Sequence, residues 1–427
     1  MEYKLSEIAD VQTGPFGSQL HNKDYVTVGT PIVTVEHLGN RRFSVQNLPL
    51  VSDNDKKRLA KYSLREGDIV FSRVGSVDRC SYVTSFEEGW LFSGRCLRVR
   101  CKNNIHPLFL YYYFCNEPVK QYIKSIAVGA TMPSINTKLM ADIPISLPNI
   151  TEQKYIADIL SSLDDKIELN RHINENLEQQ AQALFKSWFV DFEPFKDGKF
   201  VNSELGMIPE GWKVGTLSDI IKNTISGDWG KDHPQGNHVR KVFCIRGADI
   251  PDIKIGNKGS MPTRFILEKN YQSKVLIDGD VVIEISGGSP TQSTGRVCRI
   301  SNRLLEKYNN SIICTNFCKA IKPSTGYSSF LYYIWEMLYN QGVMFSYENG
   351  TTGIKNLDIN GFIQKEQIVI PPISIAADFE KMIKVFYDRI QSNGMESERL
   401  AQLRDTLLPK LMSGELKLSE IETKLDE

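Results

Sequence analysis

The chain repeats its own sequence once, and this duplication limits the folds that it can adopt. Residues 5–8 (LSEI) match residues 217–220 (LSDI), a separation of 212 positions, and TGPFG matches SGDWG one position further apart. GDIV at 67–70 then matches GDVV at 279–282. The separation grows to 221 between the two FLYY stretches, which begin at Phe109 and Phe330, and to 223 between Pro148 and Pro371. Ordered matches with a mostly growing offset predict two homologous domains, the second carrying insertions.

A long helix is predicted to follow each domain. After Thr151, the expected N-cap, neither Gly nor Pro occurs before Pro194, which predicts a helix of about 35 to 40 residues. Spacings of four and three give a heptad seam, and adding 223 gives the second helix, where Gly394 and Pro409 favour a kink or an early end. The first seam is Ile156, Leu160, Leu163, Ile167, Asn170, Asn174, Leu177, Ala181, Leu184 and Trp188. The second is Phe379, Ile383, Phe386, Ile390, Asn393, Ser397, Leu400, Arg404, Leu407 and Leu411.

Both seams are polar at their centres, where Asn170 and Asn393 occupy equivalent positions. A buried asparagine fixes register because it needs a polar partner, so we expect the two helices to pair in antiparallel fashion. The alternative is that each helix packs only on its own domain. From Ile156 to Trp188 a helix spans roughly 50 Å, which would separate two domains by between one and two turns of B-DNA.

Positive charge is concentrated in the two repeated segments, although the whole chain has 51 basic and 51 acidic residues. Residues 1–147 carry 18 basic and 14 acidic groups, and residues 206–370 carry 19 and 15, so each segment is +4. The remainder has 14 basic and 22 acidic groups and is −8. This distribution favours polyanion binding by the repeats and protein contact by the helical parts.

The fold class predicted for each repeat is α/β (α+β). Short β-rich runs such as PIVTVE and GDVVIEIS indicate a mixed, mostly antiparallel sheet, next to a helix over residues 108–124 and its copy over 328–342. The expected domains are 1–147, a first recognition domain; 148–205, a spacer helix and linker; 206–370, a second recognition domain; and 371–427, a second spacer helix and tail.

Enzymatic motifs are missing from the sequence. A methyltransferase acting alone would need an Asn/Asp-Pro-Pro-aromatic loop, but Pro371-Pro372 lies between isoleucines, and GDWGKD lacks the spacing of a phosphate-binding loop. Asp280 and Glu284 are the nearest approach to a nuclease metal site, yet alternating charges on a strand more often face solvent.

The eight cysteines are expected to be free thiols. Cys80 aligns with Cys298 and Cys96 with Cys318, which favours equivalent core positions over a zinc site. With no apolar run of membrane-spanning length and no export signal, we expect a cytoplasmic protein without a membrane contact.

Four segments resemble a known family: LPNITEQKYIADILSSLDDKIELN, LFKSWFVDFEPF, IPEGW and LLPKLMSGEL. Together with the two tandem domains they are similar to the specificity subunit of type I restriction-modification systems. The resemblance implies a non-catalytic subunit that reads a bipartite sequence in double-stranded DNA, while its helices set the gap. It also implies two methyltransferase subunits that use S-adenosylmethionine, and translocating endonuclease subunits that use ATP and magnesium. No cofactor or metal is then expected on this chain.

Candidate DNA-binding residues are polar, basic or aromatic side chains and glycines in loops, although a basic residue there is often only a solvated charge. In the first domain they are Gly14, Phe16, Ser18, Arg41, Arg42, Lys56, Lys57, Arg58, Arg73, Arg79, Thr131 and Ser134. In the second they are Trp229, Lys231, Arg240, Lys241, Arg246, Ser289, Thr291, Gln292, Arg296, Thr351, Thr352 and Lys355. A rival hypothesis is a dimerising scaffold that never touches DNA.

Overall fold

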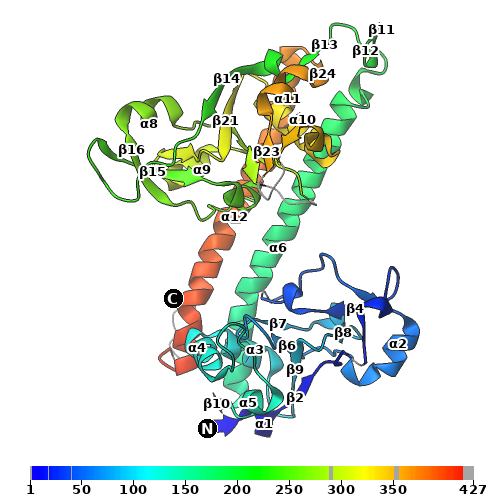
Figure 1. Ribbon diagram of the computed structural model, residues 1–427, viewed down its shortest axis with the longest axis vertical. Helices are drawn as coiled ribbons and strands as arrows, with labels where there is room; N and C mark the ends of the chain where they lie inside the picture. Colours follow the sequence, from blue (N-terminus) through cyan, green and yellow to red (C-terminus); the bar gives the residue numbers. More distant parts are fainter. Residues whose placement is uncertain (1, 18, 40, 288–291, 351–354, 417–427) are drawn as a thin grey trace. The chain divides into compact units, whose positions relative to one another are not determined.

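The computed structural model describes residues 2–17, 19–39, 41–287, 292–350 and 355–416. The chain forms two compact units: unit 1 contains residues 1–165 and the segment from 401 onwards, and unit 2 contains residues 166–400. Two long helices, α6 (Ile150–Phe189) and α12 (Ile373–Ser413), each contribute residues to both units (Figure 1). Among the described residues, no helix combines the length and the apolar character needed to cross a membrane.

Unit 1 is built on an antiparallel four-stranded sheet with a smaller sheet beside it. The central sheet has the order β2 (Ala9–Thr13), β9 (Cys96–Cys101), β6 (Ile69–Ser72), β7 (Cys80–Tyr82). The smaller sheet has the order β3 (Tyr25–Val26), β5 (Leu50–Val51), β4 (Thr30–Val33), β8 (Leu91–Phe92), and its β4–β8 pair is parallel. A short pair joins β1 (Glu2–Lys4) to β10 (Pro144–Ser146).

Unit 2 repeats this topology. Its central sheet has the order β14 (Ile221–Ser226), β21 (Cys318–Pro323), β17 (Val281–Glu284), β19 (Val297–Arg299). The second sheet has the order β16 (Thr263–Leu267), β15 (His238–Ile245), β20 (Ile312–Cys314), with β15–β20 parallel, and β13 (Lys213–Thr216) pairs with β24 (Gln367–Ile370). Another three-stranded sheet of unit 2 has the order β18 (Ser286–Gly287), β23 (Lys355–Leu357), β22 (Glu348–Asn349).

The two central sheets also share their register. Ala9 lies opposite Cys101 in β2–β9, and the residues at the equivalent places, Ile221 and Pro323, lie opposite each other in β14–β21. The structure therefore confirms the duplication and the mixed, mostly antiparallel sheet.

One helix that the sequence predicts as continuous is divided in the structure. Residues 108–124 form two helices, α3 (Pro107–Cys115) and α4 (Glu117–Ile126), separated by Asn116 with an extended ψ of 131°. Pro118 has no amide hydrogen, and its ring would clash with the carbonyl of Phe114 in a continuous helix. The copy in unit 2 has no proline there and forms the single helix α10 (Ser328–Asn340).

The expected N-cap of α6 is also wrong. The helix begins at Ile150 after Asn149, whose side-chain oxygen accepts the amide of Glu152 at 2.9 Å. The Glu152 carboxylate accepts the amide of Asn149 in return, at 3.2 Å. This reciprocal pair satisfies two amides that the first helical turn leaves free.

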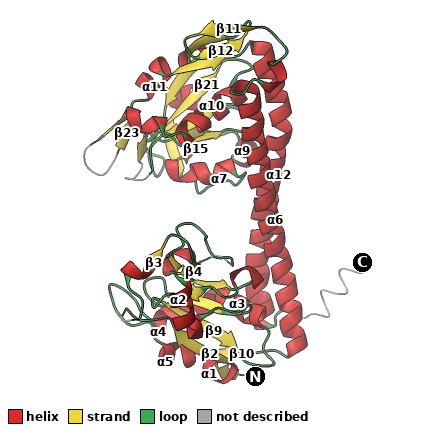
Figure 2. Ribbon diagram, turned by 90° about the vertical axis from the view of Figure 1, so that its right-hand side faces the viewer, coloured by secondary structure: helices red, strands yellow, loops and turns green. Residues whose placement is uncertain are grey.

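The helices pair within each unit (Figure 2), and the sequence colours of Figure 1 show that α12 runs opposite to α6. In unit 2 the ring of Phe379 lies within 6.0 Å of the rings of Phe185, Trp188 and Phe189, measured between centroids. In unit 1 Arg404 donates to Asp164 at 2.5 Å. The alternative of separate packing is therefore excluded, and α12 continues through Gly394 and Pro409 without ending.

Every seam position predicted from the heptads is buried or half-buried. In unit 1, Ile156 and Leu160 share a core with Leu411, so the last turns of α12 complete the domain formed by the first copy. In unit 2, Phe379 and Ile383 share a core with α10 and with Phe185 of α6. Each helix thus packs both on its partner helix and on a sheet domain.

Candidate nucleic-acid interface

Several of the loops predicted to contact DNA gather at one end of each central sheet. In unit 1, β2 and β6 both run antiparallel to β9, so their last residues lie at the end where β9 begins. Three connections meet there: the loop after β2, the loop after β6, and the turn at 93–95 that leads into β9. A sheet end of this kind presents loops on a rigid support.

Backbone hydrogen bonds join these three connections to one another and to a fourth segment, residues 128–134. The amide of Arg73 donates to the carbonyl of Arg95 at 2.8 Å, and the amide of Gly75 donates to the carbonyl of Pro133 at 2.8 Å. Val74 also forms a β-bridge with Ser134. We refer to the segments 13–17, 73–76, 93–95 and 128–134 as loop cluster 1.

The side chains of loop cluster 1 present an aromatic ring and cations. Phe16 is 53% exposed, and the guanidinium of Arg73 lies 5.3 Å from the centre of its ring. Arg73 also donates to the carbonyl of Gly94 at 3.3 Å, which holds the guanidinium over the loop after β2. Thr131 is exposed, whereas the hydroxyl of Ser134 donates to the carbonyl of Val128 at 3.2 Å.

Sequence reasoning missed Arg95. This residue is exposed in the turn before β9 and takes part in no ion pair within the part of the chain that the structure describes. A basic residue in a Ser-Gly-Arg turn directly before a strand was the available signal. Its counterpart in the repeat is Phe317, which is 60% exposed.

Unit 2 assembles the same loops. The amide of Ile285 donates to the carbonyl of Phe317 at 2.9 Å, and the amide of Leu357 donates to the carbonyl of Ile285 at 2.9 Å. We refer to the segments 226–231, 285–287, 315–317 and 355–357 as loop cluster 2. Because these segments correspond to those of loop cluster 1, the duplication extends from the sheets to the candidate sites.

A glycine at the start of each cluster has a structural reason. A Cβ on Gly14 would lie 2.2 Å from the carbonyl oxygen of Ser93, and one on Gly227 would lie 1.9 Å from that of Thr315. Any side chain there would collide with backbone. Both glycines are buried, so they permit two chain segments to approach each other within the protein.

Loop cluster 2 is more aromatic than loop cluster 1. Trp229 is 39% exposed, with the guanidinium of Arg264 held 4.0 Å from its ring centre. Lys231 is exposed next to it, and Lys355 lies 2.8 Å from the carboxylate of Glu348. The two clusters therefore share a framework but differ in the chemistry that they present.

Several predicted basic residues are instead bound to carboxylates. Arg296 makes two hydrogen bonds to the buried Glu284, at 2.7 and 2.8 Å, and Arg246 similarly holds the buried Asp249 at 3.0 and 3.1 Å. Arg41 reaches Asp165 of α6 at 2.8 Å. The other members of this group are Arg58, paired with Asp55, and Arg240, which lies 4.0 Å from Glu268 and stacks over Tyr271.

The remaining predicted cations have no carboxylate partner among the described residues. Arg42 donates to the hydroxyl of Thr84 at 2.6 Å, and Arg79 donates to the carbonyl of Leu38. Lys241 is exposed, with its ammonium 5.5 Å from the ring centre of Phe243. Lys56 and Lys57 lie on α2 (Asp53–Arg58). Gln292 is exposed, while Ser18, Ser289, Thr291, Thr351 and Thr352 lie outside the described residues.

The carboxylates considered for a nuclease site are not solvent-facing. Asp280 is 2% exposed and paired with Lys322 at 3.1 Å, and Glu284 is 4% exposed and paired with Arg296. The first copy has an equivalent of the former pair, in which Arg100 donates to Asp68 at 2.6 Å. These pairs tie neighbouring strands together, so the expectation of exposed charges was wrong.

Of the cysteines aligned in the repeat, Cys96 and Cys318 occupy equivalent core positions, opposite Ser72 and Glu284 in the central sheets. The predicted equivalence of Cys80 and Cys298 is wrong by one residue, because Cys80 lies opposite Phe71 whereas Cys298 lies opposite Val282. Cys80, Cys298, Cys96 and Cys318 are all buried free thiols. Burial raises the pKa of the Cys96 thiol to about 12. Within the described ranges, no group of three or more histidines, cysteines and carboxylates is arranged to hold a metal ion.

Comparison with known proteins identifies the family. The family model named type I restriction modification DNA specificity domain matches residues 1–179. The type I restriction enzyme MjaIX specificity subunit of Methanocaldococcus jannaschii is 32% identical over 329 residues, which cover 75% of this chain and 71% of that protein. The chain belongs to the family of type I restriction enzyme specificity subunits. Such a subunit recognises DNA and is not itself catalytic.

Two further relatives extend over most of the chain. The HindI specificity subunit of Haemophilus influenzae is 26% identical over 426 residues, covering 84% of this chain and 88% of that protein. The crystal structure of a type I restriction-modification S subunit from M. genitalium aligns with 96% of this chain and 95% of that one. Its TM-score is 0.56 at 15% sequence identity, which shows a common fold for specificity subunits of this kind.

Proposed function

We propose that this specificity subunit reads a bipartite DNA sequence, with loop cluster 1 contacting one half and loop cluster 2 the other. The observation that carries the proposal is the duplication of the site: corresponding loops meet at the same end of two sheets that share one register. A common framework with different side chains suits two readers that recognise different bases.

The exposed and half-buried side chains of the two clusters fit such contacts. In loop cluster 1, Arg73 and Arg95 offer forked donors, which suit the base edge of guanine or a phosphate. In loop cluster 2, Lys231 suits a phosphate, and the exposed rings of Trp229 and Phe317 suit apolar contact with a base. The bound arginines Arg246 and Arg296 are proposed to support the loops and not to touch DNA.

The two helices are proposed to set the gap between the half-sites. At about 1.5 Å per residue, the 40 residues of α6 make a rod about 60 Å long. Two methyltransferase subunits are proposed to dock along the helical parts, whose net charge of −8 (14 basic and 22 acidic groups) favours protein contact over DNA contact.

Cofactor chemistry is assigned to those partners. We propose that S-adenosylmethionine binds the methyltransferase subunits, and that ATP and magnesium bind translocating endonuclease subunits that join the complex. This chain would then hold none of these groups and would act through DNA and protein contacts alone.

Exchange of the first domain tests the bipartite reading. Residues 1–147 would be replaced by the corresponding domain of a relative with a different target, and methylated bases would be mapped in genomic DNA. We expect one half of the methylated sequence to change while the other half and the gap stay the same. A methylation pattern that does not change at all would refute the proposal.

A charge test separates DNA contact from scaffolding. The double variant R73A/R95A, in the assembled complex, should weaken duplex binding and lower the slope of log affinity against log salt by about two. Lys102 follows the opposite end of β9, so K102A serves as the control with an unchanged slope. Equal slopes for all three proteins would favour a scaffold that does not touch DNA at this end of the sheet.

A further inference from the structure

A loop of unit 2 packs directly on the middle of α12. Residues 253–258, here called the docking loop, comprise the end of α7 (Ile250–Lys254) and the turn that follows it. Gly256 in this loop has a φ of +86°, a conformation that favours glycine. A Cβ on Gly256 would lie 2.5 Å from the carbonyl oxygen of Ile390, so the loop reaches the helix backbone itself.

Gly394 makes this approach possible from the helix side. A Cβ on Gly394 would lie 2.3 Å from the carbonyl carbon of Gly256 and 2.4 Å from its oxygen. Glycine inside a helix costs about 1 kcal/mol relative to alanine. Its place in the middle of a 41-residue helix is therefore explained by the backbone that it admits.

Side chains from both helices hold the docking loop in place. Asn174 of α6 donates to the carbonyl of Ile255 at 3.0 Å, and Gln391 of α12 donates to the carbonyl of Ile253 at 3.4 Å. Both side chains are buried. The loop is thus bonded to both members of the helix pair, and it covers the polar centre of the seam.

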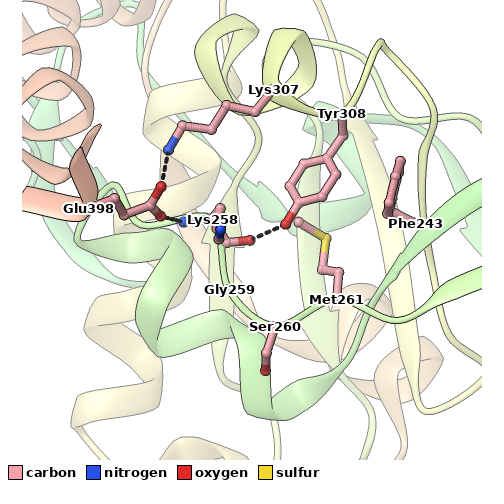
Figure 3. Close-up of a pocket in the computed structure, with 8 residues that line it drawn as sticks. All are labelled: Phe243, Lys258, Gly259, Ser260, Met261, Lys307, Tyr308 and Glu398. Atoms are coloured by element: carbon pink, nitrogen blue, oxygen red, sulfur yellow. Dashed lines mark hydrogen bonds and ion pairs between the residues drawn. The ribbon is translucent and has the colours of Figure 1, made fainter. Parts of the chain in front are cut away.

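Glu398 closes the far side of the docking loop. Its carboxylate accepts the backbone amide of Lys258 and the ammonium of Lys307, the latter at 3.0 Å (Figure 3). These residues line a cavity of about 590 Å³, together with Tyr308, whose hydroxyl donates to the carbonyl of Lys258 at 3.1 Å. A charged helix residue therefore fixes the loop by its main chain.

The first copy differs from the second at the position of Gly394. The position equivalent to Gly394 is Arg171, which is exposed and paired with Glu168 and Glu175 on its own helix. In unit 1 the 3-10 helix η2 (Val35–His37) corresponds to η7 (Gly247–Asp249), which precedes α7 in unit 2. The loop after η2 reaches α6 through the side chain of Arg41, which binds Asp165. A contact through a long side chain in a half-exposed ion pair restricts the position of a domain less than a direct contact between two backbones.

We propose that Gly394 is a positioning residue for the second recognition domain: by admitting Gly256, it fixes the orientation of that domain on the helix pair and so the gap at which the second half-site is read. This inference rests on the proposed function. Because two backbone segments are in contact here, a side chain added at Gly394 can be accommodated only if the domain or the helix moves.

The test compares G394A with E398Q, which keeps the helix backbone but loses the charge that holds the docking loop. R171A, at the equivalent position of α6, is the matched control. Hydrogen exchange in the full-length chain would report whether the loop is held. Methyl transfer by the assembled complex to duplexes whose gap varies by one base pair would report positioning.

We expect G394A to speed exchange at residues 253–258 about tenfold, and to reduce the preference for the natural gap over its neighbours about fivefold. E398Q should act in the same direction more weakly and carries the test if G394A fails to fold, while R171A should match the wild type. Faster exchange with an unchanged gap preference in both variants would overturn the inference. Methyl transfer by the wild-type complex at a rate that does not depend on the length of the gap would instead refute the proposed function.

Discussion

Asn393 of α12 donates its side-chain amide to the side-chain oxygen of Asn174 of α6 at 2.9 Å, in the buried centre of the seam. The amide of Asn174 donates in turn to the carbonyl of Ile390 at 3.2 Å. Asn170 joins the same network, since its amide donates to the backbone carbonyl of Asn393 at 3.4 Å and to Glu396 at 2.9 Å. The network makes this register of the two helices more stable than a shifted one, because a shift would leave buried side-chain amides without hydrogen-bond partners.

Replacing Asn393 with leucine should lower the stability of unit 2. The substitution leaves the side-chain oxygen of Asn174 buried without a donor, which costs about 1–3 kcal/mol. Urea unfolding followed by circular dichroism measures the difference, and an N393L variant as stable as the wild type would contradict this account.

Two arginines on β9 should respond in opposite ways to replacement by methionine. Arg98 is 7% exposed, and its side chain lies 6.0 Å from the ring centre of Phe92 and makes no hydrogen bond or ion pair among the described residues, whereas Arg100 binds Asp68 twice at 2.6 Å. Burial and the charge of Arg100 lower the pKa of Arg98, which indicates a disfavoured cation. R98M should therefore raise the unfolding temperature.

R100M is the comparison variant for that measurement. It leaves the carboxylate of Asp68, 1% exposed, without its cation, and breaking a buried pair costs about 3–5 kcal/mol. Because Arg100 is partly exposed to solvent, we expect a loss of unfolding free energy at the lower end of that range. A fall in stability for R98M as large as that for R100M would show that Arg98 stabilises the fold.

Alanine at Gly14 should disrupt loop cluster 1, whereas alanine at Gly17 should not. The new Cβ at residue 14 meets the carbonyl oxygen of Ser93 at 2.2 Å, but at residue 17 it meets nothing within 4 Å. Overpacking against backbone costs about 1–3 kcal/mol or more. G14A should accordingly lower thermal stability and duplex affinity together, and equal behaviour of both variants in a melting experiment would reject the role assigned to Gly14.

Glu178 of α6 should make the stability of unit 2 depend on pH. Burial raises its pKa above the ordinary 4.5, against hydrogen bonds from Gln182 and Tyr333 and the charge of Lys254, and Glu336 raises it further. The folded state therefore binds a proton more readily than the unfolded chain. Stability from this group is highest below pH 4.5 and falls as the pH rises from there to the folded pKa.

E178Q should abolish this dependence and stabilise unit 2 at neutral pH. The amide keeps the shape of the side chain and needs no charge in a buried place. Unfolding would be measured at several pH values between 4 and 8 for both proteins. A variant whose stability falls with pH as steeply as that of the wild type would assign the effect to another group.

The duplication and the helices were accessible from the sequence because both follow from local pattern. Glycine turns and apolar runs recur in order, so the equivalence of the two domains and a few of their strands could be predicted. The heptads gave the buried positions of the seam for the same reason. The break at Asn116 depends on a single proline, Pro118, and was readable but overlooked.

The state of each basic residue could not be read from the sequence. Arg41 is bound by Asp165, 124 positions later, and Arg246 is held partly by Ser260. These distant partners decide whether a basic side chain is paired within the protein or available to contact DNA. Gly394 illustrates the same limit, since it weakens a helix on its own but admits Gly256 in the folded unit.

The closing turns of α12 place the buried side chains of Leu408 and Leu411 in the same core as Leu5 and Ile8. The unit that begins at the N-terminus is therefore unfinished until the C-terminal residues have left the ribosome. A chain interrupted before residue 401 would lack apolar side chains that cover Leu5 and Ile8, so loss of the last turns of α12 should destabilise the unit that contains the first residues.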